Sequence, residues 1–139
     1  MKLELKHLAP YLPYGLKVLS SFSESATISS LHLTDLESRK AVNLQLDGVP
    51  ITFRGDNLDS IKPILRPLSD LKTIEKEIKL VDSYWYVDDY LTEKCTVDKI
   101  YPLHVIEFIP YAIMQVLLKH HFDVFGLIEK GLAIDINTL

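Results

Sequence analysis

The chain lacks several residue types and sequence motifs that particular functions require. Its single cysteine, Cys95, excludes an internal disulfide framework and a zinc site built from several thiolates. It has no glycine-rich loop that could cradle a phosphate and no dinucleotide-binding fingerprint. The formal net charge of -4 shows no excess of basic residues, which argues against a dedicated nucleic-acid coat. These absences leave functions that need none of those motifs.

The chain also lacks a long uninterrupted hydrophobic run. Its most apolar stretch, from residue 100 to residue 118, contains Pro102, His104, Glu107 and Pro110. A charged residue near the centre of a bilayer costs about 2.5–3.5 kcal/mol on insertion scales, so we interpret this stretch as buried core and expect no membrane partner. Charged residues alternate with leucine at the N-terminus, so we expect no secretory signal peptide and predict a reducing compartment.

What is present is enough apolar sequence for a hydrophobic core. The 139 residues are 47% hydrophobic, which fits one globular domain. Residues 1–68 are β-rich in pattern, with apolar and polar residues alternating, whereas residues 69–139 carry the longer apolar blocks of helices. We therefore predict a single α+β domain over residues 1–139, with an N-terminal antiparallel sheet of about four or five strands packed by C-terminal helices.

The clearest local pattern in the first half is a β-hairpin over residues 41–53. Asp47 and Gly48 tolerate the positive φ angles that a tight type I′ turn requires. Pro50 cannot donate a ladder hydrogen bond, so we place the return strand at a sheet edge. Apolar residues alternate with polar ones along both strands: Val42, Leu44, Leu46, Val49, Ile51 and Phe53. Further extended segments are predicted at 16–19, at 26–33, where the alternation slips once, and at 63–68.

Helices are predicted in the second half and briefly at the N-terminus. Leu5, Leu8 and Leu12 have helical spacing, but two prolines limit that helix to about two turns. A helix is predicted from Ser69, with apolar residues at helical spacing as far as Ile78.

The last third of the chain is predicted to hold two more helices and a strand. Pro110 is suited to start a helix reaching about His121, and its nearly all-apolar surface indicates either a central position or docking against another chain. Asp123 is predicted to cap a short helix over 124–130. Residues 132–137 are predicted to form a final strand, or a tail laid onto a partner.

Three stretches resemble a known group of proteins. They are Leu8-Ala9-Pro10-Tyr11-Leu12-Pro13-Tyr14-Gly15-Leu16, residues 57–71 and residues 121–135. Together they resemble small uncharacterised proteins encoded by phages and prophages of anaerobic gut bacteria. That family has no assigned activity, so the resemblance implies a mobile genetic element in a bacterial cytoplasm and implies no mechanism. Residues 81–101 do not share the resemblance.

Two pairs of residues suggest chemistry and have plainer explanations. His120 and Asp123 are three residues apart on a helix and could share a metal ion, but a polar helix end with Asp123 as the next cap explains them better. Cys95 and His104 could act as nucleophile and base, but no nucleophile motif surrounds Cys95, so we favour a structural cysteine.

The acidic segment from Asp82 to Glu93 is a further candidate. Its acids could bind a hard cation, but their spacing matches no calcium loop, so we favour a solvated loop. The aromatic residues within it, Tyr84, Trp85 and Tyr86, fit a protein interface and a packed core equally well. An alternative function is therefore a metal-dependent or small-ligand-binding enzyme that uses these acids with His104 or His120.

Basic residues gather between Arg54 and Lys79. Acidic residues are interspersed among them, so we favour a mixed, solvated surface and expect no nucleic-acid partner. A nucleic-acid accessory protein using this segment is kept as a second alternative.

The leading hypothesis is a non-catalytic accessory protein that acts through protein–protein contacts. We expect a homo-oligomer, or a complex with another phage or host protein, with no cofactor, no metal and no catalytic residues. The residues predicted to form the interface are Tyr84, Trp85, Tyr86, Ile113, Leu117, Leu118, Phe122, Ile134 and Ile136.

Overall fold

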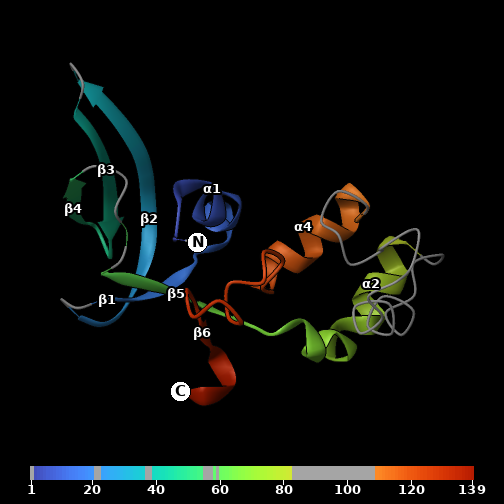
Figure 1. Cartoon of the computed structure of the whole chain (residues 1–139). Coiled ribbons are helices and arrows are strands. Elements are labelled where there is room, and N and C mark those ends of the chain that lie inside the picture. The colour runs from blue at the N-terminus through green and yellow to red at the C-terminus, as the bar shows by residue number, and fades with distance from the viewer. Residues whose placement is uncertain (1, 21–22, 37–38, 55–57, 59, 83–108) are drawn as a thin grey trace.

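A computed structural model describes residues 2–20, 23–36, 39–54, 58, 60–82 and 109–139. Its strands form one six-stranded sheet in the order β4-β3-β2-β1-β5-β6. The helices lie on one side of this sheet (Figure 1). The predicted α+β class is confirmed.

The strands are β1 (Lys17–Ser20), β2 (Ser23–Leu36), β3 (Arg39–Leu46), β4 (Val49–Arg54), β5 (Ile61–Leu65) and β6 (Ile134–Asp135). The helices are α1 (Leu5–Leu8), α2 (Glu75–Val81) and α4 (Tyr111–Lys119), with the 3-10 helices η1 (Ala9–Tyr14), η2 (Leu68–Ile74) and η4 (Ile136–Thr138). The pairs β1–β2, β2–β3, β3–β4 and β1–β5 are antiparallel. The first five strands therefore form the predicted N-terminal antiparallel sheet.

The predicted hairpin is present as β3 and β4. Asp47 and Gly48 have φ angles of 51° and 81°, and the flanking residues Leu46 and Val49 pair directly. The Asp47 carboxylate also accepts the Thr27 backbone N–H at 2.9 Å, which ties the turn to β2. Pro50 lies on β4, at one edge of the sheet as predicted.

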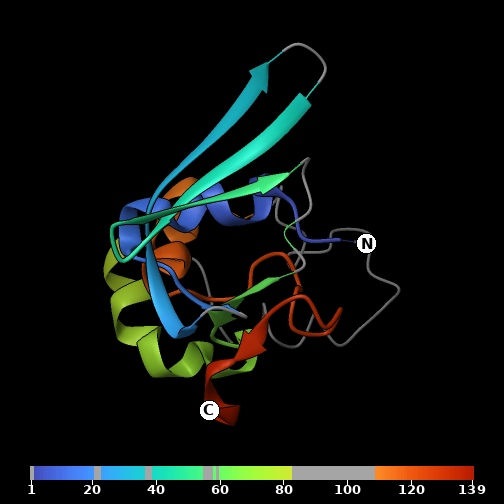
Figure 2. The same cartoon turned by 90° about the vertical axis from the view of Figure 1, so that its left-hand side faces the viewer.

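Strand β2 is longer than the sequence pattern indicates. It runs for 14 residues and extends beyond β1, paired on its other side with β3, which in turn pairs with β4 from Leu46 to Ala41 (Figure 2). The register between β2 and β3 shifts between Ile28 and Ser30. This irregularity accounts for the slip in the sequence alternation, because an extra residue moves the following side chains to the other face.

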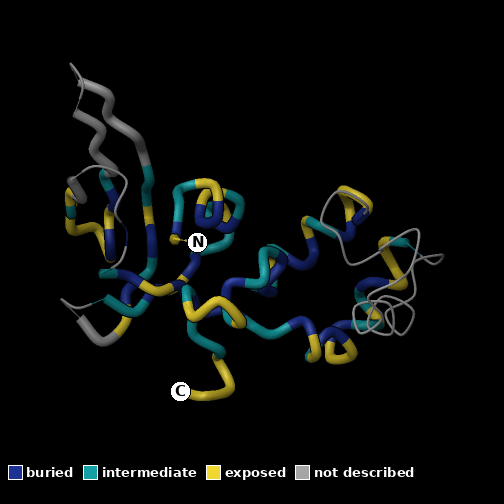
Figure 3. The backbone as a smooth tube through the Cα atoms, in the orientation of Figure 1, coloured by how far each residue is buried: buried dark blue, intermediate teal, exposed yellow. Residues whose placement is uncertain are grey.

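The helix predicted from Ser69 begins differently. Residues 68–74 form the 3-10 helix η2, and regular α-helix begins at Glu75. The apolar positions Leu71, Ile74 and Ile78 are nevertheless buried, so the predicted inward face is confirmed. The buried residues of the described ranges form one hydrophobic cluster, to which both the sheet and the helices contribute (Figure 3).

The predictions for the end of the chain need two corrections. The predicted helix over 124–130 is wrong: this segment consists of turns. Asp123 still caps it, because its carboxylate accepts the N–H groups of Leu127 and Ile128, each at 2.8 Å. The predicted final strand is reduced to the two residues of β6, which pair in parallel with β5 and so complete this chain's own sheet.

A buried polar contact joins the N-terminal turn to this C-terminal segment. Tyr11 is fully buried, and its hydroxyl donates to the Phe122 carbonyl at 2.6 Å. The same hydroxyl accepts the Val124 N–H at 3.4 Å. Burial raises the pKa of Tyr11, so the phenol stays protonated and can donate. The two backbone groups also bond each other, because the Val124 N–H donates to the Phe122 carbonyl at 2.9 Å, and the Tyr11 hydroxyl ties this turn to the N-terminal segment.

Replacing Tyr11 with phenylalanine tests the contribution of that hydroxyl. The Tyr11→Phe variant keeps the ring but removes the buried hydrogen bond to the Phe122 carbonyl, which costs about 0.5–1.5 kcal/mol. We expect the free energy of unfolding, measured in urea, to fall by that amount. Tyr14→Phe, on a less buried ring of the same turn, serves as the control and should change it by less than about 0.5 kcal/mol.

Candidate functional site

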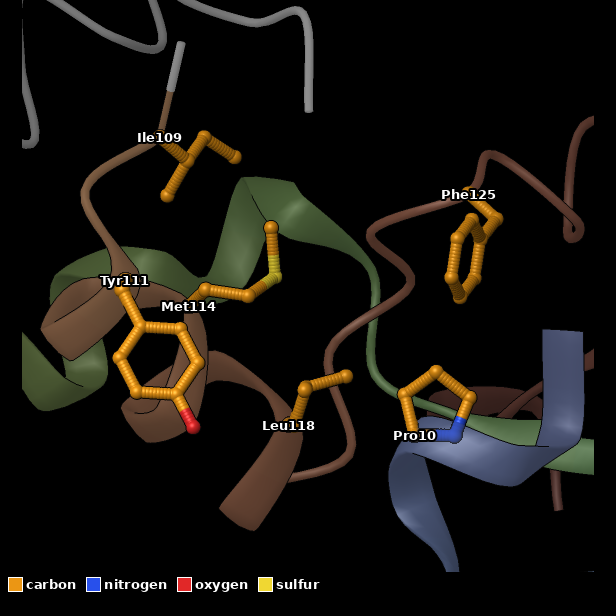
Figure 4. A pocket seen from close by; sticks show the side chains of 6 residues that line it. All are labelled: Pro10, Ile109, Tyr111, Met114, Leu118 and Phe125. Atoms are coloured by element: carbon orange, nitrogen blue, oxygen red, sulfur yellow. The ribbon is translucent and has the colours of Figure 1, made fainter. Parts of the chain in front are cut away.

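An apolar pocket of about 310 Å³ lies beside α4. Side chains from three parts of the chain surround it (Figure 4). They come from η1, from the start and one side of α4, and from the turns after Asp123: Pro10, Ile109, Tyr111, Met114, Leu118 and Phe125. Tyr111 is 77% exposed and contributes a large aromatic surface.

Local spacing and buried contacts place these side chains. Tyr111, Met114 and Leu118 follow one another at helical intervals, so they share one side of α4. Phe125 is held by edge-on contacts with the rings of His7, at 5.5 Å between centroids, and Tyr11, at 6.3 Å. The pocket wall is therefore fixed to the core by aromatic packing.

His7 packs against Phe125 from outside the pocket and is neutral. It is buried, and its Nδ1 accepts the Glu4 backbone N–H at 3.0 Å. Burial lowers the pKa of His7, against the attraction of the Glu4 carboxylate, so the neutral imidazole is favoured. The ring supports Phe125 without bringing a charge to the pocket.

A polar cluster lies between α2 and α4. The Glu77 carboxylate accepts hydrogen bonds from His120 Nε2, at 2.6 Å, and from Lys119 Nζ, at 3.3 Å. These residues lie beside a second pocket of about 270 Å³ that is lined by Tyr14, Glu77, Val81, Ala112, Gln115, Val116 and Lys119. The hydrogen bond from His120 lowers the pKa of Glu77, partial burial opposes this, and Lys119 lowers it further. The cluster links the two helices electrostatically.

The metal pair suggested by the sequence is not formed. His120 turns to Glu77, whereas both oxygens of Asp123 accept backbone N–H groups within their own turn. Within the described ranges no group of three His, Cys, Asp or Glu side chains could hold a metal ion. The polar helix end and cap therefore explain His120 and Asp123.

The predicted interface residues fall into different surroundings. Ile113, Leu117 and Phe122 are completely buried in this chain's own core, so they present no surface to a partner. Leu118 is half-buried and lines the apolar pocket. On the last segment, Ile134 is half-buried in β6 and Ile136 is 44% exposed.

The remaining candidates lie outside the described residues. They are the aromatic group Tyr84, Trp85 and Tyr86, the acids after Asp82 as far as Glu93, and Cys95 and His104.

Some of the basic residues between positions 54 and 79 are engaged within the chain. The Arg66 guanidinium lies over the Phe122 ring, 5.6 Å from its centroid. Lys79 forms an ion pair with Glu75 at 3.3 Å, one helical turn away. These two basic side chains are therefore held by contacts within the chain.

Several site residues were missed in the sequence. The helical spacing of Tyr111, Met114 and Leu118 is a signal that could have shown a shared helix side. Glu77 offers no such signal, because it lies 43 residues from His120.

Comparison with protein-family models, with curated proteins and with solved structures finds no match for this chain. Within the described ranges no helix is both long and apolar enough to cross a membrane.

The lowered pKa of Glu77 makes a pH-dependent contribution to stability. A carboxyl group with a lowered pKa in the folded state stabilises the fold above its ordinary pKa, 4.5, and this contribution disappears as the pH falls through the folded value. We expect Glu77→Gln to unfold at a lower temperature than the parent at pH 7, and the difference to shrink toward pH 3. Thermal unfolding across that range measures it.

The control for this comparison is Glu129→Gln, which changes an exposed carboxylate in the C-terminal turns. It should leave the unfolding temperature nearly unchanged at both pH values. A deficit in Glu77→Gln that is equally large at pH 3 and pH 7 would contradict the role assigned to the ionised carboxylate.

Proposed function

We propose that this chain is a non-catalytic accessory protein that acts through protein–protein contacts. The observation that carries the proposal is the apolar pocket beside α4, with Tyr111 exposed beside it and Leu118 half-buried within it. Leu118 also belongs to the interface predicted from the sequence. The resemblance of three stretches to phage and prophage proteins supports a bacterial cytoplasm as the setting.

The chemistry of the pocket favours an apolar side chain of a protein partner. No charged side chain is among the six residues that line it. Burying one large aliphatic or aromatic side chain there would contribute about 1.5–3 kcal/mol. An exposed tyrosine beside the pocket is typical of the aromatic residues that dominate binding energy in interfaces. The partner we propose for it is another protein of the phage or of its host.

A photo-reactive phenylalanine at position 111 tests this function in the bacterial host. We expect irradiation to link the chain to one discrete protein. The same amino acid at Glu129, which is also exposed, should give no such product. The absence of a product at position 111, or the same products at both positions, would contradict the proposal.

Substitution at Leu118 then shows whether the pocket itself is used. We expect Leu118→Glu to reduce the cross-linked product at least about tenfold, because truncating an interface hot spot costs about 2 kcal/mol or more. Ala112→Glu places the same charge at an exposed position of α4 that does not line this pocket and should preserve the product. Thermal unfolding of both variants confirms that they fold.

A further inference from the structure

His7 connects the N-terminal helix α1 to the wall of the apolar pocket. Its side chain is only 2% exposed, and its ring packs edge-on against the ring of Phe125, with 5.5 Å between the centroids. Phe125 lines the pocket on the side across from Tyr111 (Figure 4). Phe125 therefore contacts both the pocket and His7, and a change at His7 reaches the pocket through one ring.

The imidazole of His7 has to be neutral to make its hydrogen bond. Its Nδ1 accepts the Glu4 backbone N–H at 3.0 Å, so the proton of the neutral ring is on Nε2. An imidazolium carries a proton on both nitrogens and accepts no hydrogen bond. A proton gained at Nδ1 would therefore set two donors against each other at the start of α1.

The surroundings of His7 also disfavour its charged form. Burial has the largest effect and lowers the pKa of His7 from its ordinary 6.5. The Glu4 carboxylate raises this pKa, but it lies 3.2 Å from Lys6 Nζ and is already paired. Lys6 in α1 and Lys130 in the C-terminal turns lower it. The Lys130 Nζ donates to the Phe125 carbonyl at 3.2 Å, so this cation belongs to the same wall.

We propose that His7 is a pH-sensitive support of the pocket beside α4. When the ring is neutral, it accepts from Glu4 and packs against Phe125. When the ring gains a proton, its charge is not solvated in the buried position, so the ring moves toward water. Phe125 then keeps its contact with Tyr11 but loses the contact with His7, and the pocket wall changes its shape.

This inference concerns the regulation of the surface that carries the proposed function, so its use rests on that function. A partner that needs Phe125 in place binds the chain with neutral His7 better than the chain with charged His7. Such a ligand shifts the protein toward the form it prefers. The affinity of the partner is therefore highest above the titration of His7 and falls as the pH falls through it.

Nuclear magnetic resonance of the free chain tests the support directly. The chain has two methionines, Met1 and Met114, and Met114 lines the pocket. The methyl group of Met114, labelled with carbon-13, therefore reports on the pocket. We expect its signal to shift in one step as the pH is lowered below 6.5, with the same midpoint as the ring signals of His7.

Replacing His7 with glutamine removes the titration but keeps an acceptor. Glutamine at the third position of a helix commonly accepts the N–H of the N-cap residue, and it is neutral at every pH. We expect His7→Gln to abolish the step in the Met114 signal. His120→Gln is the matched control, because His120 makes its hydrogen bond to Glu77 of α2, and it should keep the step.

A second variant changes the surroundings of His7 and leaves its ring in place. Lys130→Gln removes an exposed cation that disfavours the charged form of His7. We expect the midpoint of the step to move to higher pH. This variant keeps the proposal testable if His7→Gln does not fold.

Three results would overturn the proposal. They are a step at Met114 that persists in His7→Gln, a His7 ring that titrates without any change at Met114, and a midpoint that Lys130→Gln leaves where it is. The spectra are those of the free chain, so they do not depend on capturing a partner. A missing cross-link at position 111 contradicts the proposed function alone, whereas these three results contradict the pH-sensitive support alone.

Discussion

The anchoring of residues 121–124 to Tyr11 and to the end of β5 is the constraint on which most of this structure depends. Arg66 donates its N–H to the His121 carbonyl and accepts the Asp123 N–H, both at 2.8 Å. Between those two bonds, the Phe122 carbonyl accepts the Tyr11 hydroxyl, from a residue 111 positions away. A short segment is thus held from two directions, and Phe122 is completely buried.

The anchored segment, residues 121–124, sets the positions of the elements that precede and follow it in the chain. It ends α4, and it is followed by the Asp123 turns, which place Phe125 against the rings of His7 and Tyr11. One side of α4 then borders an apolar pocket, and another meets α2 through Glu77. The apolar side suits a protein contact, whereas the charges of the α2 side already satisfy one another.

Local sequence predicts the elements whose physics is local. The hairpin around Asp47 and Gly48 depends on two adjacent residues that accept positive φ angles, so a single sequence was enough to place it. The segment after Asp123 was misjudged because a capping carboxylate and apolar residues satisfy a turn as well as a helix. The residues predicted for an interface include core positions such as Leu117, because an apolar helix shows the same pattern whether it packs on its own chain or on another.

The sequence by itself determined the α+β class, the antiparallel N-terminal sheet and the inward face of the residues around Ile78, because hydrophobic period and turn chemistry act over a few residues. Only the tertiary structure decided that Leu117 is core while Leu118 lines a pocket, and that His120 pairs with Glu77 rather than Asp123. It also decided that β2 outruns β1, which pairs with it only as far as Thr27. These outcomes depend on contacts between residues far apart in the chain, whose geometry no local pattern encodes.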